Sequence, residues 1–180
     1  RFLSRIHQEA DRLISLINDI LRLSQLDEGG ALPHEQVSVL ELAQEAARSL
    51  TAQAAAQAVH ISVTGTAGTV FGVRRLLYEI ARNLCENAVK YNVPGGSVTV
   101  EVAETDRDVT LLVRDTGIGI PEGDQSRVFE RFYRVDKSHS RAIGGTGLGL
   151  SIVKHAVAYH HGTLRLESQP GKGTVITVTL

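Results

Sequence analysis

The sequence predicts an α+β fold in which one long α-helix precedes a domain of shorter helices and β-hairpins. Three observations support this prediction. Apolar side chains recur three and four residues apart over residues 2–26, the spacing of a helix that packs along a seam. A helical period returns over residues 76–92, where polar residues occupy the opposite face. Two pairs of runs, within residues 98–113 and 164–180, alternate apolar and polar residues around turn residues, as hairpin strands do.

Composition and charge restrict the class of protein. The chain has 180 residues, 42% of them hydrophobic, which is enough for one domain of about 150 residues with something attached. A formal charge of −1 gives no reason to expect nucleic acid or an anionic membrane surface as a partner. No apolar run approaches the roughly 18 residues of a membrane span, and no signal peptide is recognisable. The single cysteine, Cys85, suits a reducing cytoplasm, and a chain that starts at Arg1 is expected to be an excised fragment.

The leading helix carries a broader apolar stripe than one neighbouring helix could cover. Its seam consists of Leu3, Ile6, Ala10, Leu13, Ile17, Ile20 and Ser24, widened by Ile14, Leu16, Leu21 and Leu23. We therefore predict packing in a helical bundle, across a dimer, although a helix folded back onto its own domain is the alternative. Because Gly29 and Gly30 end the helix, we place a boundary between residues 1–29 and 30–180.

The rest of the chain is predicted from hydrophobic period and turn residues. The expected elements are a short strand at 36–39, a helix at 40–57, a strand at 60–64, a helix at 76–92, a hairpin within 98–113, a long loop at 121–144, a helix at 147–161 and a hairpin within 164–180.

Two glycine-rich segments, 115–121 (DTGIGIP) and 144–150 (GGTGLGL), suggest backbone that approaches a ligand closely. The usual phosphate loops do not fit. A Walker loop needs Lys and then Ser or Thr after its last glycine, a dinucleotide motif needs a glycine at position 150, and the protein-kinase loop needs a Val-Ala-Ile-Lys strand downstream. The segments are therefore either a different nucleotide site or ordinary turn glycines.

The helix at 76–92 presents Glu79, Asn83, Asn87 and Lys90 on one face. Asparagine is unfavourable inside a helix, so two of them one turn apart require a reason. Amide oxygens and a nearby lysine would suit Mg²⁺ and phosphate, whereas the alternative is a solvated face.

The segment 121–144 is long for a loop in a compact domain, which favours a lid over a plain surface loop. Its cations are Arg127, Arg131, Arg134, Lys137 and Arg141. We assign Arg134 and Lys137 as phosphate contacts, and we expect Phe129, Phe132 and Tyr133 to wedge the lid against the body. The helix that follows begins near Gly147 and can direct its free N–H groups at phosphates. A metal site at His155, His160 and His161 is set aside because no carboxylate or cysteine joins them at ligand spacing.

Four motifs in this order resemble those of bacterial sensor histidine kinases. They are Asn83-x-x-x-Asn87-Ala88-x-Lys90-Tyr91, Asp115-x-Gly117-x-Gly119, residues 129–134 (FERFYR) and residues 145–150 (GTGLGL), which are similar to the N box, first G box, F box and second G box of that family. The resemblance covers nearly the whole chain, and residues 132–156 are similar to the phosphate-regulon sensor (PhoR-like) kinases. The wider superfamily includes DNA gyrase, gyrase-like heat-shock chaperones and the MutL mismatch-repair proteins.

The resemblance implies an α/β sandwich of the Bergerat type, a mixed β-sheet with helices on one face, which binds ATP and Mg²⁺ between the helices and the lid. In the family the carboxylate at Asp115 accepts a hydrogen bond from the adenine amino group, and Asn87 holds the Mg²⁺. The nucleotide-binding residues that it implies are Asn83, Asn87, Lys90, Tyr91, Asp115, Gly117, Gly119, Ile120, Tyr133, Arg134, Lys137, Gly145, Thr146, Gly147, Leu148, Gly149 and Thr174.

The resemblance also identifies residues 1–29 as the second helix of a dimerisation and phosphotransfer hairpin. The first helix carries the phospho-accepting histidine in a His-Glu-x-x-x-Pro box. His7 is followed by Gln8 and no proline, so neither an acceptor nor a catalytic residue is assigned within this chain. The implied partners are the protein's own upstream histidine-bearing helix, a second copy and a response regulator. The parent is expected to be membrane-anchored, with this part on the cytoplasmic side.

The predicted function is transfer of the ATP γ-phosphate to that upstream histidine. Hydrolytic relatives carry a glutamate, the water-activating base, where Asn83 stands, and an amide cannot take a proton from water. Two alternatives stay open: a nucleotide-binding sensor module without transfer activity, and an ATPase that drives dimer rearrangement. A serine-directed anti-sigma kinase shares the pocket, but the leading helix and the box at 129–134 speak against it.

Overall fold

The computed structural model describes residues 14, 17, 32–135 and 146–180. In chain order its elements are β1 (Glu35–Ser38), α2 (Val39–Ser49), α3 (Thr51–Ala56), β2 (His60–Gly65), β3 (Thr69–Gly72), α4 (Arg74–Lys90), β4 (Ser97–Glu104), β5 (Val109–Asp115), α5 (Glu122–Gln125), α7 (Gly149–Tyr159), β6 (Thr163–Gln169) and β7 (Gly173–Thr179). Apart from Ile14 and Ile17, which are helical, the leading helix lies outside the described residues. Its packing and the boundary at residue 29 therefore stay predictions.

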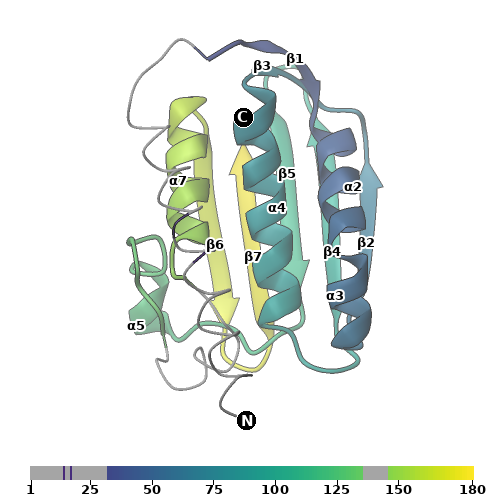
Figure 1. The fold of residues 1–180 in the computed structure, drawn as a ribbon. Coiled ribbons are helices and arrows are strands. Elements are labelled where there is room, and N and C mark those ends of the chain that lie inside the picture. Colours follow the sequence, from purple (N-terminus) through teal and green to yellow (C-terminus); the bar gives the residue numbers. More distant parts are fainter. Residues whose placement is uncertain (1–13, 15–16, 18–31, 136–145) are drawn as a thin grey trace.

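The main sheet has five strands in the order β2-β4-β5-β7-β6 (Figure 1). Strands β2 and β4 are parallel, and the other neighbours are antiparallel, so the sheet is mixed as expected. The two predicted hairpins are confirmed as β4–β5 and β6–β7. A separate two-stranded sheet pairs β1 with β3.

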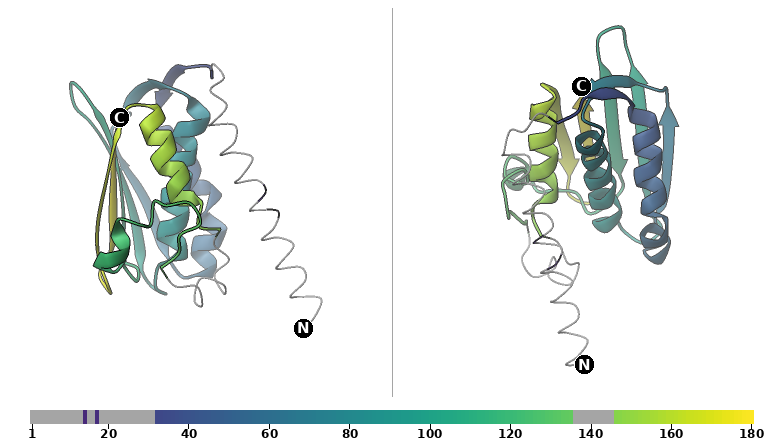
Figure 2. Two further views of the ribbon diagram at one scale, coloured as in Figure 1. Left: turned by 90° about the vertical axis from the view of Figure 1, so that its left-hand side faces the viewer. Right: turned by 45° about the horizontal axis from the view of Figure 1, so that its top comes forward.

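The helices α2, α3, α4 and α7 cover one face of the sheet, and no helix of the described residues covers the other face (Figure 2). Helix α4 lies in the middle of this layer, between α2 and α7 (Figure 1). The predicted two-layer α/β sandwich is therefore confirmed. Among the described residues, no helix is both long enough and apolar enough to cross a membrane.

The core lies between the two layers and follows the predicted periods. Leu77, Ile80, Leu84 and Ala88 of α4 are buried, one or two turns apart. Every second residue of β4, namely Val98, Val100 and Val102, is buried against them, as are Val109, Leu111 and Val113 of β5. Cys85 is fully buried in this core.

The helix expected at 40–57 is instead two helices that meet at Leu50, which has φ −102° and ψ 0°. Hydroxyl groups explain the break. Ser49 Oγ donates to the Ala46 carbonyl at 2.7 Å, and Thr51 Oγ1 donates to the Arg48 carbonyl at 3.0 Å, and such bonds bend helices. The strand β3 was not predicted, because four residues are too few to establish an alternating pattern. Helix α7 is also two residues shorter at each end than the predicted 147–161.

The chain direction brings three element ends to one edge of the molecule, the lower edge in Figure 1. The end of α4, the start of α7 and the end of β5 lie there, and each carries one of the motifs singled out in the sequence. The fold therefore gathers motifs that are spread from Asn83 to Leu150 in the sequence.

Candidate nucleotide-binding site

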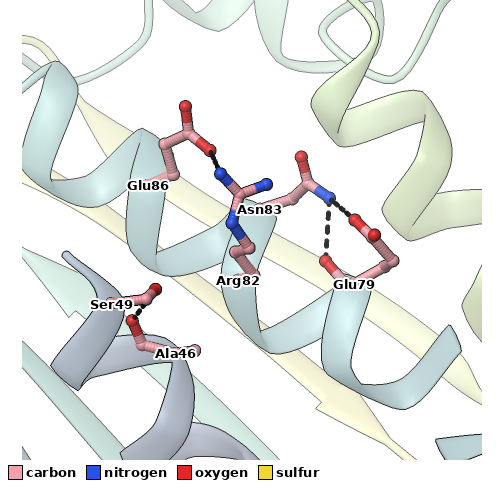
Figure 3. A network of polar contacts seen from close by, with 6 residues as sticks. All are labelled: Ala46, Ser49, Glu79, Arg82, Asn83 and Glu86. Atoms are coloured by element: carbon pink, nitrogen blue, oxygen red, sulfur yellow. Dashed lines mark hydrogen bonds and ion pairs between the residues drawn. The ribbon is translucent and has the colours of Figure 1, made fainter. Parts of the chain in front are cut away.

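The two asparagines of α4 face the start of α7. A Cβ added at Gly149 would lie 2.9 Å from Asn83 Oδ1 and 3.7 Å from Asn87 Nδ2, so only a glycine leaves room between the helices at this point. Asn83 Nδ2 donates to the backbone carbonyl of Glu79 at 2.8 Å and to its carboxylate at 3.2 Å (Figure 3). The carboxamide stripe is therefore part of a packed helix contact and is not a plain solvated face.

Asp115 ends β5 beside the carboxyl end of α4. Its Oδ1 accepts hydrogen bonds from the backbone N–H of Gly117 at 2.8 Å and of Thr174 at 3.2 Å. Burial raises the pKa of the Asp115 carboxyl, while these two N–H groups act in the opposite direction. A Cβ at Gly117 would lie 2.3 Å from the carbonyl of Tyr91, so the glycine lets the loop approach α4.

The loop after Asp115 is also fixed to the β6–β7 hairpin. Gly119 has φ +69°, and a Cβ there would lie 2.1 Å from the carbonyl of Gln169. The N–H of Ile120 donates to Ser168 Oγ at 2.8 Å, and Ser168 Oγ lies 2.9 Å from Thr174 Oγ1. Ser168 was not singled out in the sequence, although a hydroxyl that follows Leu164 and Leu166 on the core-facing side of β6 was a visible signal.

The described part of the lid, residues 121–135, is held to the body mainly by polar contacts. Gln125 Nε2 donates to the carbonyls of Ile120 and Ser168 at 3.0 and 2.9 Å. Tyr133 donates its hydroxyl hydrogen to Asp124, and the Arg127 guanidinium lies 4.2 Å from the centre of the Tyr133 ring. The expectation that Phe132 wedges the lid against the body was wrong, because its side chain is 56% exposed.

The lid and the second glycine segment contact each other through their backbones. The N–H of Phe132 donates to the carbonyl of Gly147 at 2.9 Å. Both residues have left-handed backbones, with φ +65° at Phe132 and φ +75° at Gly147. A Cβ at Gly147 would lie 2.9 Å from the carbonyl carbon of Phe132, so glycine is required where the two segments meet.

Arg134, beside the contact between Phe132 and Gly147, has donor atoms without hydrogen-bond partners in the part of the chain that the structure describes. Its Nε and Nη2 atoms are buried and have no hydrogen-bond partner among the described residues. Its charge acts on Tyr91 at the end of α4, where burial raises the pKa of the phenol and the Arg134 guanidinium opposes that rise. Buried donors without acceptors are rare in folded proteins, and a guanidinium matches phosphate oxygens well. The structure therefore shows two buried donors of Arg134 without an acceptor among the described residues.

Of the remaining predicted residues, those that the structure describes lie along the same edge. Lys90 Nζ is 5.9 Å from the centre of the Tyr91 ring. Thr146 Oγ1 accepts a hydrogen bond from the N–H of Leu148 at 3.3 Å. Leu148 is fully buried and occupies the N-cap position of α7, where its apolar side chain makes no capping hydrogen bond. Lys137 and Gly145 lie outside the described residues.

His160 has a structural role at the start of α4. His160 Nε2 accepts the N–H of Val73 at 3.0 Å, and its Nδ1 lies 2.8 Å from the Ala156 carbonyl. The ring therefore satisfies one N–H group at the start of α4, where Val73 provides no side-chain cap. Over residues 32–135 and 146–180 no group of three His, Cys, Asp or Glu side chains is arranged to hold a metal, so a cation here would need amide and phosphate oxygens.

The fold and the site define a nucleotide-binding domain of the Bergerat type: a mixed sheet, one covered face, and glycine loops that meet an asparagine-bearing helix. Residues 72–180 match the family described as histidine kinase-, DNA gyrase B- and HSP90-like ATPases, and the chain belongs to that family.

The chain is homologous to sensor histidine kinases. It is 41% identical to the sensor-like histidine kinase SenX3 of Mycolicibacterium smegmatis over 184 residues, which cover 100% of this chain and 47% of that protein. It is 35% identical to the sensor histidine kinase WalK of Bacillus subtilis, covering 100% of this chain and 30% of WalK. The chain thus spans about half the length, or less, of these relatives.

Solved structures agree with the fold. A solved chain of the mycobacterial sensor histidine kinase MprB superposes with a TM-score of 0.71 at 33% identity, covering 82% of this chain and 97% of the solved MprB chain. Full-length ShkA, solved in complex with AMPPNP, superposes with a TM-score of 0.83 at 26% identity, covering 99% of this chain and 37% of ShkA.

Proposed function

We propose that this chain binds ATP and catalyses transfer of the γ-phosphoryl group to a histidine of the protein's own dimerisation hairpin, as the catalytic part of a sensor histidine kinase. The observation that carries the proposal is the pair of buried, unpartnered donors of Arg134, which lies beside the glycine segment and the end of α4. A buried guanidinium without an acceptor destabilises the fold, so its retention indicates a ligand that supplies one.

The adenine end of the site is Asp115. One of its oxygens is occupied by the N–H groups of Gly117 and Thr174, which fixes the carboxylate plane and leaves the other oxygen to accept from the adenine amino group. Tyr91, Ile120 and the glycines of the first loop form the surroundings of the base. The recognition of adenine thus rests on one preorganised acceptor.

The phosphate end lies nearer the middle of α4, at Asn83, about 12 Å from Tyr91 by the helical rise of 1.5 Å per residue. The first-turn N–H groups of α7 would meet the triphosphate there, while Lys90 and Arg134, which lie near Tyr91, would add positive potential between the two ends. Thr146, Gly147, Leu148 and Gly149 form the turn that presents these N–H groups, and we assign Lys137 and Gly145 to the same end.

The donor set fits Mg²⁺. Asn83 Oδ1 faces the start of α7, and Asn87 lies one turn further along α4, so amide oxygen and phosphate oxygen could share the ion. When bound, Mg²⁺ supplies neutralisation of phosphate charge and fixes the terminal phosphoryl group. Asn87 would hold it, while Lys90 and Arg134 would stabilise the charge on the leaving diphosphate.

Transfer is favoured over hydrolysis because of what Asn83 lacks. Its amide nitrogen is engaged by Glu79, and its oxygen has no basic lone pair strong enough to take a proton from water. The attacking group would therefore be the acceptor histidine.

We assign residues 1–29 to the second helix of the hairpin and residues 30–180 to the catalytic domain. The proposed partners are a second copy of the protein and a response regulator. The proposed location is the cytoplasmic side of a membrane-anchored parent protein.

The first test is calorimetric titration of this chain with ATP, with and without Mg²⁺, beside Asp115→Ala. Saturable binding that Mg²⁺ alters and that Asp115→Ala abolishes would support the site. Transfer of labelled phosphate to a supplied hairpin that carries the acceptor histidine would then support the kinase. Failure of a folded sample to bind ATP would contradict the proposal, and ATP turnover without the hairpin would favour an ATPase.

A further inference from the structure

Glu79 is a buried carboxylate that the mechanism so far does not use. It lies on α4 one turn before Asn83, and its side chain is 9% exposed. Figure 3 shows Glu79 and Asn83 on the side of α4 that faces α7, whereas Arg82 and Glu86 form an ion pair on another side. Burying a carboxylate is unfavourable unless its interactions offset the loss of water. Such a residue in the middle of a helix therefore calls for an explanation.

The contacts of Glu79 determine which way the amide of Asn83 points. The backbone carbonyl and the carboxylate of Glu79 lie 2.8 and 3.2 Å from Asn83 Nδ2, and both groups can only accept hydrogen bonds. The amide nitrogen must face them, because an amide oxygen in that place would meet two acceptors. The oxygen is consequently turned toward Gly149, where an added Cβ would lie 2.9 Å from it.

We propose that Glu79 is a positioning residue that keeps the oxygen of Asn83 directed at the cation and phosphate end of the nucleotide site. This inference rests on the proposed function, since it needs ATP and Mg²⁺ to bind beside the start of α7. The backbone carbonyl alone would hold the Asn83 amide nitrogen by one neutral hydrogen bond. A carboxylate adds a second, charge-assisted acceptor, which is roughly twice as strong as a neutral one.

The choice of glutamate over glutamine follows from the same geometry. A glutamine at position 79 would present either its oxygen or its NH₂ group to Asn83, and the NH₂ group could turn the Asn83 amide around. A carboxylate excludes the reversed orientation. Glu79 therefore acts through Asn83 and need not touch the nucleotide.

The test compares the dissociation constant of ATP without Mg²⁺, in EDTA, with that in Mg²⁺, measured by calorimetry on the whole chain. We expect Glu79→Leu, which keeps the bulk but removes the acceptor, to lower the ratio of the two constants by about tenfold, the loss of one hydrogen bond to a charged group. Glu79→Gln should lower it by only about two- to threefold. The constant measured in EDTA should not change in either variant.

The matched control is Glu86→Leu, the same change two turns further along α4, at a carboxylate paired with Arg82 at 3.4 Å on another side of the helix from Asn83. It should leave both constants as in the wild type. A double-mutant cycle adds a test that a structural role would fail: in the Asn83→Ala background, Glu79→Gln should have no further effect on the ratio. Because the cycle uses Glu79→Gln, it tests the positioning role of Glu79 even if Glu79→Leu does not fold.

The outcomes separate this inference from the proposed function. A wild-type chain that binds no ATP overturns both. If Mg²⁺ changes the dissociation constant of ATP equally in the wild type and in Glu79→Leu, the role of Glu79 is overturned and the kinase proposal stands. Equal weakening with and without Mg²⁺ in Glu79→Leu, or a wild-type ratio near one, also overturns it, because the effect would then not pass through the oxygen of Asn83.

Discussion

Replacing Arg134 by methionine should make the unliganded protein more stable and its binding of ATP weaker. Two of its buried donor atoms have no acceptor among the described residues, and leaving a buried donor unsatisfied costs about 1–3 kcal/mol. Methionine has a similar length and no donor. We therefore expect the free energy of unfolding to rise by about 1–3 kcal/mol, which for a chain of this size raises the melting temperature by roughly 2–4 °C per kcal/mol.

The same substitution should remove the donors that meet the phosphates. Hydrogen bonds to charged groups contribute about 1.5–3 kcal/mol, so the dissociation constant of ATP should rise by roughly 10- to 150-fold. Thermal melts without nucleotide and calorimetric titration with ATP and Mg²⁺ measure the two effects on one sample. Their opposite signs distinguish a binding residue from a structural one, since a structural arginine would lower both stability and affinity when removed.

Arg127→Met in the same lid is the control. Its guanidinium pairs with Glu130 at 3.6 Å, stacks on Tyr133 and is 53% exposed, so its donors are not stranded. No gain in melting temperature is expected, and the ATP constant should stay within about threefold, because exposed ion pairs contribute little. The reasoning on Arg134 would be refuted by a lower melting temperature together with unchanged ATP binding in Arg134→Met.

Three further predictions follow from single residues. Gly147 and Gly171 share φ +75°, but a Cβ would lie 2.9 Å from Phe132 at the first and near no other atom at the second. Both alanine variants should therefore lose about 1–2 kcal/mol of stability from backbone strain. Only Gly147→Ala should also weaken ATP binding, by about 5- to 150-fold, because of the added overlap. Equal dissociation constants for ATP in the two variants, measured by calorimetry, would contradict the contact between the lid and Gly147. Burial raises the pKa of Asp115 above its ordinary value of 3.8, so its contribution to stability is present below that pH and is lost as the pH rises through the folded-state pKa. Melting curves at increasing pH should show the wild type losing stability relative to Asp115→Asn over that interval, and parallel curves would show that the carboxyl is not buried as described. Burial raises the pKa of the Cys85 thiol to about 12, and the thiolate is the reactive form. Alkylation of Cys85, followed by mass spectrometry, should therefore be slow in the native chain and faster in denaturant. Rapid labelling of the folded protein would contradict the burial of Cys85 in the core.

Much of the fold could be predicted because its layers follow simple periods. Val98, Val100 and Val102 alternate along β4, and the buried face of α4 repeats every three to four residues. What failed was local. The division of α2 from α3 depends on the hydroxyl groups of Ser49 and Thr51 bonding back to carbonyls, a competition that apolar spacing does not reveal.

The candidate site was predictable as a set of motifs but not as a set of contacts. The spacing of Asn83 and Asn87 indicated oxygen ligands, yet only the structure shows that Glu79 engages the amide nitrogen and leaves the oxygen free to face Gly149. The arginines of the lid were equally plausible from composition. Arg134 differs from Arg127 in that its donors are buried and find no acceptor among the described residues, which is a property of packing between segments distant in sequence.

Two unfavourable features of the described residues lie where the ligand is proposed to bind. Phe132 has a left-handed backbone and is 56% exposed, and Arg134 buries donors that have no acceptor among the described residues. Each costs stability in the free protein, and selection for stability alone would replace them with residues that fit their surroundings. A nucleotide that satisfies the guanidinium and fixes the lid would recover part of this cost, and binding to the folded state alone stabilises it by RT ln(1 + [L]/Kd). The strain at Phe132 and the unsatisfied donors of Arg134 thus support the same location for the site as the motifs do, and this argument does not depend on the resemblance.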